Sequence, residues 1–139
     1  MKGFNHENTK RGNRKNEENI RFEELSRKII GAAIEVHRVL GPGFLENIYE
    51  EALKLELQKR SILYDSQKEI KIEYLGDQVG LHRLDMVVAN EIIVELKAVK
   101  ELSDIHLAQL LSYLKAANLK VGLLLNFSKP TLEIKRVVK

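Results

Sequence analysis

Two short apolar segments, residues 84–88 and 92–98, constrain the fold of this chain more than any other feature of its sequence. Each has an apolar residue at every second position: Leu84, Met86 and Val88 in the first, and Ile92, Val94, Leu96 and Ala98 in the second. A period of two is typical of β-strands with one buried face. Because only three residues separate the segments, we expect them to pair as an antiparallel hairpin.

The length of the connection sets the register of this hairpin. A three-residue loop, Ala89-Asn90-Glu91, places Met86 opposite Val94 and puts the apolar residues of both strands on one face. A two-residue loop would mix charged and apolar side chains on a shared face, so the apolar pattern favours the three-residue loop. The same register places Asp85 opposite Glu95. We therefore expect Asp85, Glu95 and Lys97 to converge on the other face.

Such a cluster suits metal-assisted hydrolysis of a phosphodiester. Carboxylate oxygens bind Mg²⁺ or Mn²⁺, which activates a water and offsets developing negative charge. Lys97 could orient that water or stabilise the charge. The alternative is a solvated surface pair of Glu95 and Lys97, which would contribute little. Glu-x-Lys spacing alone is a weak signal, because Glu69-Ile70-Lys71 and Glu133-Ile134-Lys135 repeat it.

The remaining segments predict one α/β domain with a mixed β-sheet flanked by helices. A helical period begins at Phe22 and must stop at Gly41-Pro42-Gly43. We expect further helices over 45–59 and after the N-cap Ser103, and strands over 70–74, 79–89, 92–99, 121–125 and 131–138. In the second helix, Leu45, Ile48, Tyr49, Ala52 and Leu53 should face inward, and Glu50, Glu51 and Lys54 outward.

Residues 1–20 differ in composition from residues 21–139. They carry five Lys or Arg and three Glu, with almost no large apolar side chain. Such a segment cannot bury enough surface to offset its ordering entropy, so we predict a disordered basic tail before a domain over 21–139. A solvated tail and a weak phosphate-attracting arm are both compatible with this composition.

Composition excludes several classes of protein. The chain has no Cys, which rules out disulfides and thiolate sites, and its four His are scattered. No apolar run approaches the roughly 20 residues that span a bilayer, and the N-terminus is polar, so we expect a cytoplasmic protein without a membrane partner. The formal net charge of +3 is compatible with a nucleic-acid partner.

Several motifs, taken in order, resemble those of a known superfamily. Asp85, Glu95-x-Lys97 and Gln109-x-x-x-Tyr113 resemble the PD-(D/E)XK nucleases, especially the RecB-type branch. The run from Gly43 to Tyr49, GFLENIY, is similar to the signature of the GxxExxY family, which is assigned to that superfamily. Residues 34–43 and 122–127 also resemble this family, and the likeness extends over roughly 25–138. Leu84 stands where the superfamily often has Pro.

The resemblance implies a restriction-endonuclease-like αβββαβ core and a role for each matching residue. It implies Mg²⁺ or Mn²⁺ bound by Asp85, Glu95 and Glu46, with Lys97 as a further catalytic residue. Glu35 is the rival of Glu46 as the helix carboxylate of the site. Gln109 and Tyr113 would contact a substrate phosphate or the metal-bound water, or form only a polar flank of their helix. Apart from the resemblance, Arg83 shares a strand face with Asp85 and could contact phosphate or simply neutralise the cluster.

The sequence therefore predicts a metal-dependent nuclease-like domain that hydrolyses phosphodiester bonds of DNA or RNA. The alternatives are a non-catalytic nucleic-acid-binding or scaffolding protein that retains the fold, and a hydrolase of small phosphodiesters. With four Phe, four Tyr and no Trp, backbone contacts are favoured over base stacking. The sequence leaves open a homodimer and the choice between endonuclease and exonuclease.

Overall fold

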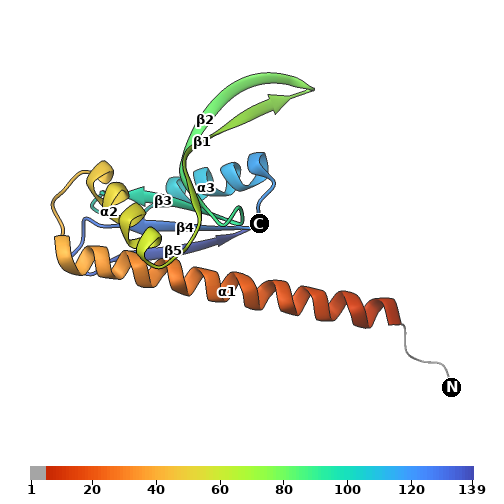
Figure 1. Ribbon diagram of the computed structural model, residues 1–139. Helices are drawn as coiled ribbons and strands as arrows, with labels where there is room; N and C mark the ends of the chain where they lie inside the picture. Colours follow the sequence, from red (N-terminus) through yellow and green to blue (C-terminus); the bar gives the residue numbers. More distant parts are fainter. Residues whose placement is uncertain (1–5) are drawn as a thin grey trace.

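The computed structural model describes residues 6–139, which form three helices and five strands (Figure 1). In chain order these elements are α1 (His6–Leu40), α2 (Glu46–Lys59), β1 (Tyr64–Tyr74), β2 (Asp77–Val88), β3 (Ile92–Lys97), α3 (Asp104–Ala117), β4 (Val121–Asn126) and β5 (Glu133–Val138). The order contains the expected αβββαβ core. Residues 1–5 of the predicted tail lie outside the described residues.

The strands form a single mixed sheet in the order β1-β2-β3-β4-β5. Strands β3 and β4 run parallel, and the other neighbouring strands run antiparallel. One apolar cluster joins α1 and α2 to the sheet, and a second joins α3 to the opposite face. The predicted fold class, an α/β fold with a mixed sheet between helices, is confirmed.

The two central strands are buried on both faces. Parallel pairing of β3 with β4 requires a crossover, and α3 supplies it. Helices then cover both faces, so β3 and β4 are nearly continuous apolar runs. Gly122 in β4 lies directly beneath Leu110 of α3, where an added Cβ would stand 2.9 Å from the Leu110 side chain. The lack of a side chain at Gly122 thus lets α3 approach the sheet closely.

The register predicted for β2 and β3 is confirmed. Met86 lies opposite Val94 and Val88 opposite Ile92, with residues 89–91 as the connection. Ala89 and Asn90 both adopt left-handed backbone conformations, with φ of 53° and 58°. This conformation is typical of tight hairpin connections.

The prediction that Leu84 shares a face with Met86 and Val88 is wrong. Leu84 packs in the α3 cluster, whereas Met86 and Val88 pack against α1 and α2. The β2–β3 ladder ends at the pair Met86–Val94, and the β1–β2 ladder has no pair at residue 85, between Ser66–Met86 and Lys68–Leu84. The alternation of β2 is therefore interrupted between Leu84 and Met86.

The inward face of α2 also differs from the prediction. Tyr49 and Leu53 are fully buried, but Leu45 is 72% exposed and Ile48 is 42% exposed. Leu45 is the N-cap residue of α2 and Ile48 lies in its first turn, whereas the buried residues Tyr49, Leu53 and Leu57 follow at four-residue spacing. Glu50, predicted to face outward, is half-buried.

Helix α1 begins at His6 and therefore includes most of the segment predicted to be a disordered tail. Two ion pairs connect its N-terminal half to the sheet: Glu18 with Lys120 at 2.6 Å, and Arg21 with Glu91 at 2.8 Å. Apart from Glu18, side chains 11–20 are exposed, including that of Ile20, the large apolar residue among them. Among the described residues, no helix combines the length and apolar character that crossing a bilayer requires.

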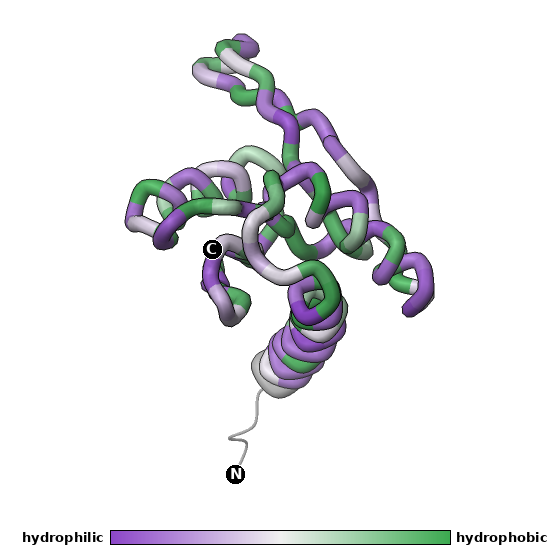
Figure 2. Tube along the Cα trace, turned by 90° about the vertical axis from the view of Figure 1, so that its left-hand side faces the viewer, coloured by the Kyte–Doolittle hydropathy of each residue, from purple (hydrophilic) through white to green (hydrophobic). Residues whose placement is uncertain are grey.

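Strands β1 and β2 extend past the rest of the sheet as a curved arm (Figure 1). They have 11 and 12 residues, whereas β3 has six. Apolar and hydrophilic residues are interspersed along this arm (Figure 2), and Leu75 at its tip is 85% exposed. The inner end of the arm carries Asp85.

Removing residues 1–20 should change the melting temperature by less than about 4 °C, because exposed ion pairs contribute little and the segment adds almost nothing to the core. Ile29→Ala, which empties a fully buried position on the same helix, should cost about 2–5 kcal/mol. Calorimetry of the three proteins tests this. A truncation as destabilising as Ile29→Ala would show that the segment is part of the core.

Candidate active site

Asp85 and Glu95 meet where β2 and β3 separate. Beyond the last ladder pair, the Asp85 backbone N–H donates to Glu95 Oε1 at 3.2 Å. The Leu96 backbone N–H donates in turn to Asp85 Oδ2 at 3.0 Å. Side-chain carboxylates thus accept backbone hydrogen bonds in the gap between the strands. The two residues come together, though in this gap rather than on one flat face of the sheet.

Glu95 is only 6% exposed, which excludes the alternative of a solvated surface carboxylate. Burial and then the negative charge of Asp85 raise the pKa of Glu95 to about 8. The Asp85 N–H and Lys97 act in the opposite direction, but they do not offset burial. At neutral pH the pair therefore tends to hold a proton that two isolated carboxylates would release.

A cavity of about 200 Å³ lies beside this pair, between α2 and the strands. It is lined by Glu46, Asn47, Glu50, Gln67, Asp85 and Leu96. Glu46 Oε1 accepts a hydrogen bond from the Ala98 backbone N–H at 3.3 Å, which ties α2 to the end of β3. Gln67 donates to Glu50 Oε1 at 2.8 Å. Burial is the main cause of a raised pKa at Glu50, and Asp85 adds to it.

Tyr49 holds the loop that delivers Glu46 to this cavity. Its hydroxyl donates to the Gly41 carbonyl at 2.6 Å and accepts from the Phe44 N–H at 3.1 Å. Its ring stacks on Phe127 with centroids 4.4 Å apart. Gly41 adopts a φ of +68°, a conformation that glycine adopts without strain. Tyr49 therefore acts as a structural support, as expected of a core tyrosine.

Lys97 ends β3 next to the carboxylates. Within residues 6–139, its ammonium has no hydrogen bond or ion pair, so it is available to a ligand. The fully buried Asn126 fixes the chain that follows, because its side chain accepts from the Val99 N–H at 3.0 Å and donates to the Val99 carbonyl at 2.8 Å. The Phe127 N–H also donates to the Lys97 carbonyl at 2.9 Å.

Tyr113 and His82 approach the pair from the α3 side. Their rings stack with centroids 3.9 Å apart. Burial, Glu95 and Asp85 together raise the pKa of the Tyr113 hydroxyl. Burial lowers the pKa of His82, which favours the neutral imidazole, and its buried Nε2 has no hydrogen-bond partner among the described residues.

Three other candidates form no hydrogen bond or ion pair with Asp85 or Glu95 among the described residues. Gln109 is exposed on α3. Arg83 forms an ion pair with Glu69 across the β1–β2 arm at 3.3 Å. Glu35 is bound by Arg38 through two hydrogen bonds on α1, whereas its rival Glu46 lines the cavity with Asp85.

In the described part of the chain, no three His, Asp or Glu side chains form a group that could hold a metal ion. The expected trio of Asp85, Glu95 and Glu46 is thus not a ready-made cage. Two carboxylates meet directly, and the third accepts its hydrogen bond from Ala98.

Sequence reasoning missed four residues around the pair: Glu50, Gln67, His82 and Asn126. The four-residue spacing of Glu46 and Glu50 could have placed both on one helix face. Nothing in the sequence marks Gln67, whose φ of 53° interrupts β1 opposite Asp85. The stacking of His82 on Tyr113 depends on how α3 packs over the sheet, which strand periodicity does not specify.

In metal-free buffer, the free energy of unfolding should fall as pH rises from about 4.5 to 8. Over this window the folded protein retains a proton on Glu95 that the unfolded chain releases, so rising pH favours unfolding. Glu95→Gln should flatten this slope, and denaturant unfolding at several pH values measures it. Glu73→Gln, at an exposed carboxylate on β1, is the control. An unchanged slope in Glu95→Gln would show that Glu95 ionises normally.

Tyr49→Phe should destabilise the domain by about 1–3 kcal/mol, because two backbone groups of the α1–α2 loop lose their hydrogen-bond partner while ring stacking remains. Tyr64→Phe, which removes only an exposed hydrogen bond to Gln58, should cost less. Thermal unfolding of both variants tests this. Equal losses would mean that the Tyr49 hydroxyl is not a specific support.

Similarity to known proteins identifies the superfamily of this chain. A comparison with curated proteins finds no match. Among solved structures, one described as "Crystal structure of SSO0001" is similar in fold, with a TM-score of 0.51 and 17% sequence identity over 67% of this chain. The aligned region covers 49% of that protein, so this chain spans about half of its length. The family model described as PD-(D/E)XK nuclease superfamily matches residues 23–137. The chain therefore belongs to the PD-(D/E)XK nuclease superfamily.

Proposed function

We propose that this protein is a metal-dependent nuclease that hydrolyses phosphodiester bonds of DNA or RNA. The observation that carries the proposal is the hydrogen-bonded Asp85–Glu95 pair, partly withdrawn from water beside the Lys97 ammonium, which has no partner within residues 6–139. Bringing two carboxylates together in a buried strand opposes folding, and the domain core does not need it. A site that binds a cation explains the arrangement.

The residues present fit Mg²⁺ or Mn²⁺. Magnesium is usually held by one or two carboxylates, with waters and substrate phosphates as its other ligands, so a full protein cage is not required. Asp85 and Glu95 would hold the ion, with Glu46 at the edge of the same cavity. When bound, the metal would supply an activated water and neutralise charge on the phosphate.

The other side chains suggest a division of roles. Lys97 would stabilise negative charge as it develops on the phosphate, because its ammonium is free within the described chain. Tyr113 would present its hydroxyl to a substrate phosphate from the α3 side, and Gln109 and Arg83 would contact more distant parts of a long substrate. His82 supports the Tyr113 ring.

We further infer that the chain belongs to the GxxExxY branch of the superfamily. Each of the three residues that name this signature has a different structural role here. Gly43 has a φ of +118°, and Glu46 lines the cavity. Tyr49 holds the loop between α1 and α2 through its two hydrogen bonds.

A cleavage screen tests the nuclease proposal. Labelled single- and double-stranded DNA and RNA are incubated with the protein in Mg²⁺, Mn²⁺ or EDTA. Cleavage should require metal and should fall at least about 100-fold in Asp85→Ala and Lys97→Ala, the size of a lost electrostatic or acid–base contribution. Lys71→Ala is the matched control, since Lys71 occupies the same Glu-x-Lys spacing on the exposed strand β1.

Metal binding can be measured separately from cleavage. Millimolar Mg²⁺ or Mn²⁺ should raise the melting temperature of the wild type and of Lys97→Ala, but not of Asp85→Ala. A shift that survives in Asp85→Ala would place the ion elsewhere. Nucleic-acid binding without cleavage under any condition would favour the alternative, a non-catalytic binding protein that retains the fold.

A further inference from the structure

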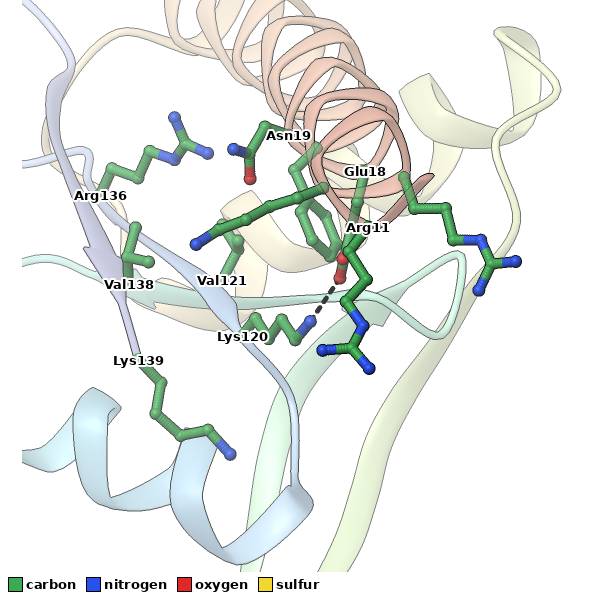
Figure 3. Close-up of a pocket in the computed structure, with 11 residues that line it drawn as sticks. Arg11, Glu18, Asn19, Lys120, Val121, Arg136, Val138 and Lys139 are labelled. Carbon is green, nitrogen blue, oxygen red and sulfur yellow. Dashed lines mark hydrogen bonds and ion pairs between the residues drawn. The ribbon is translucent and has the colours of Figure 1, made fainter. Parts of the chain in front are cut away.

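A basic groove of about 490 Å³ lies away from the carboxylates, between the N-terminal half of α1 and the ends of β4 and β5 (Figure 3). Six of its lining residues are Lys or Arg: Arg11, Arg14, Lys15, Lys120, Arg136 and Lys139. Phe22, Val121 and Val138 supply apolar surface. The cations come from both walls, because α1 provides three of them and the strand side provides the other three.

Part of the positive charge of this groove has no carboxylate partner among the described residues. Its one carboxylate, Glu18, is engaged by Lys120 at 2.6 Å, and that hydrogen bond lowers the pKa of Glu18. Among the described residues, Arg14 and Arg136 have no carboxylate partner, and Lys139 donates only to the neutral Asn118 side chain at 3.3 Å. Figure 3 shows the Arg136 side chain directed across the groove toward Asn19 of α1.

We propose that this groove binds the phosphate backbone of a nucleic acid at a distance from the cleavage site. Gathering like charges from two separate elements opposes folding, whereas a polyanion that fits between them would compensate charges on both walls, including those of Arg14 and Arg136. Guanidinium groups suit phosphate oxygens because they donate in a planar fork. This inference rests on the proposed function for the identity of the polyanion.

The groove and the carboxylate pair lie at different positions along strand β4. Val121 at the groove pairs with Ile92, and Leu124, three residues further along, pairs with Glu95. Three residues of strand extend about 10 Å. A duplex rises by the same distance over about three base pairs. The groove would therefore hold a long substrate a few nucleotides from the bond that is cut.

Binding in EDTA tests this inference without catalysis. The double variant Arg14→Glu/Arg136→Glu is compared with Lys28→Glu/Lys135→Glu, which makes the same charge change at exposed positions on the same two elements, α1 and β5. Fluorescence anisotropy of labelled DNA and RNA oligonucleotides gives Kd over a range of salt concentrations. The groove variant should bind at least about tenfold more weakly. The negative slope of the log association constant against log salt concentration should become shallower by about two.

The binding results test the groove independently of the proposed nuclease activity. If both double variants bind oligonucleotides equally weakly, or if neither binds more weakly than the wild type, the proposal that the groove binds nucleic acid would be overturned. Arg14→Gln/Arg136→Gln, a milder change, serves if the Glu variant fails to fold by circular dichroism. Tighter binding of an acidic peptide than of any oligonucleotide would reassign the groove to a protein partner.

Hydrolysis of bis(4-nitrophenyl) phosphate with Mn²⁺ provides the second measurement. The groove variant should retain this activity, because a small diester does not reach the groove, whereas Asp85→Ala should lose it. The wild type could bind oligonucleotides through the groove yet hydrolyse neither the oligonucleotides nor bis(4-nitrophenyl) phosphate. That result would refute the nuclease proposal, whereas the proposal that the groove binds nucleic acid would stand.

Discussion

Burial of β3 on both faces is the constraint from which the properties of this molecule follow. Helices α1 and α2 cover one side of the strand and α3 covers the other, so any charged side chain in its middle loses water. Glu95 occupies such a position and is 6% exposed. On a strand face that is exposed to water, a carboxylate would be an ordinary solvated group. Here its surroundings raise its pKa to about 8 and make its ionisation sensitive to any cation nearby.

The surrounding structure holds this unfavourable arrangement in place. Two hydrogen bonds between backbone and carboxylate join Asp85 and Glu95 where the ladder ends. On one side Tyr49 fixes the loop before Glu46, and on the other Asn126 fixes the loop after Lys97. These supports are buried and rigid, while the groups they position are partly accessible. This distribution is typical of a site that gives up stability for function.

The sequence predicts the order of elements and the β2–β3 register because apolar periodicity and loop length determine both. The prediction for Leu84 fails because the left-handed Gln67 interrupts the β1–β2 ladder opposite Asp85, and sequence alternation does not reveal that interruption. Nor does the sequence distinguish the three Glu-x-Lys segments by spacing. Glu69 and Glu133 lie on edge strands and form ion pairs, while Glu95 lies on the central strand. Helix α1 extends to His6 because helical structure can continue at the surface without adding buried area.

Gly122 shows how a site can depend on a residue that it never contacts. The missing side chain on β4 leaves room for Leu110, and Leu110 belongs to the same helix that carries Tyr113 over the carboxylates. The contact between α3 and the sheet at this point therefore depends on the absence of one methyl group. A Cβ at this position would stand 2.9 Å from the Leu110 side chain, which would have to change its rotamer or position. The packing of the helix that carries Tyr113 is in this sense encoded on a neighbouring strand.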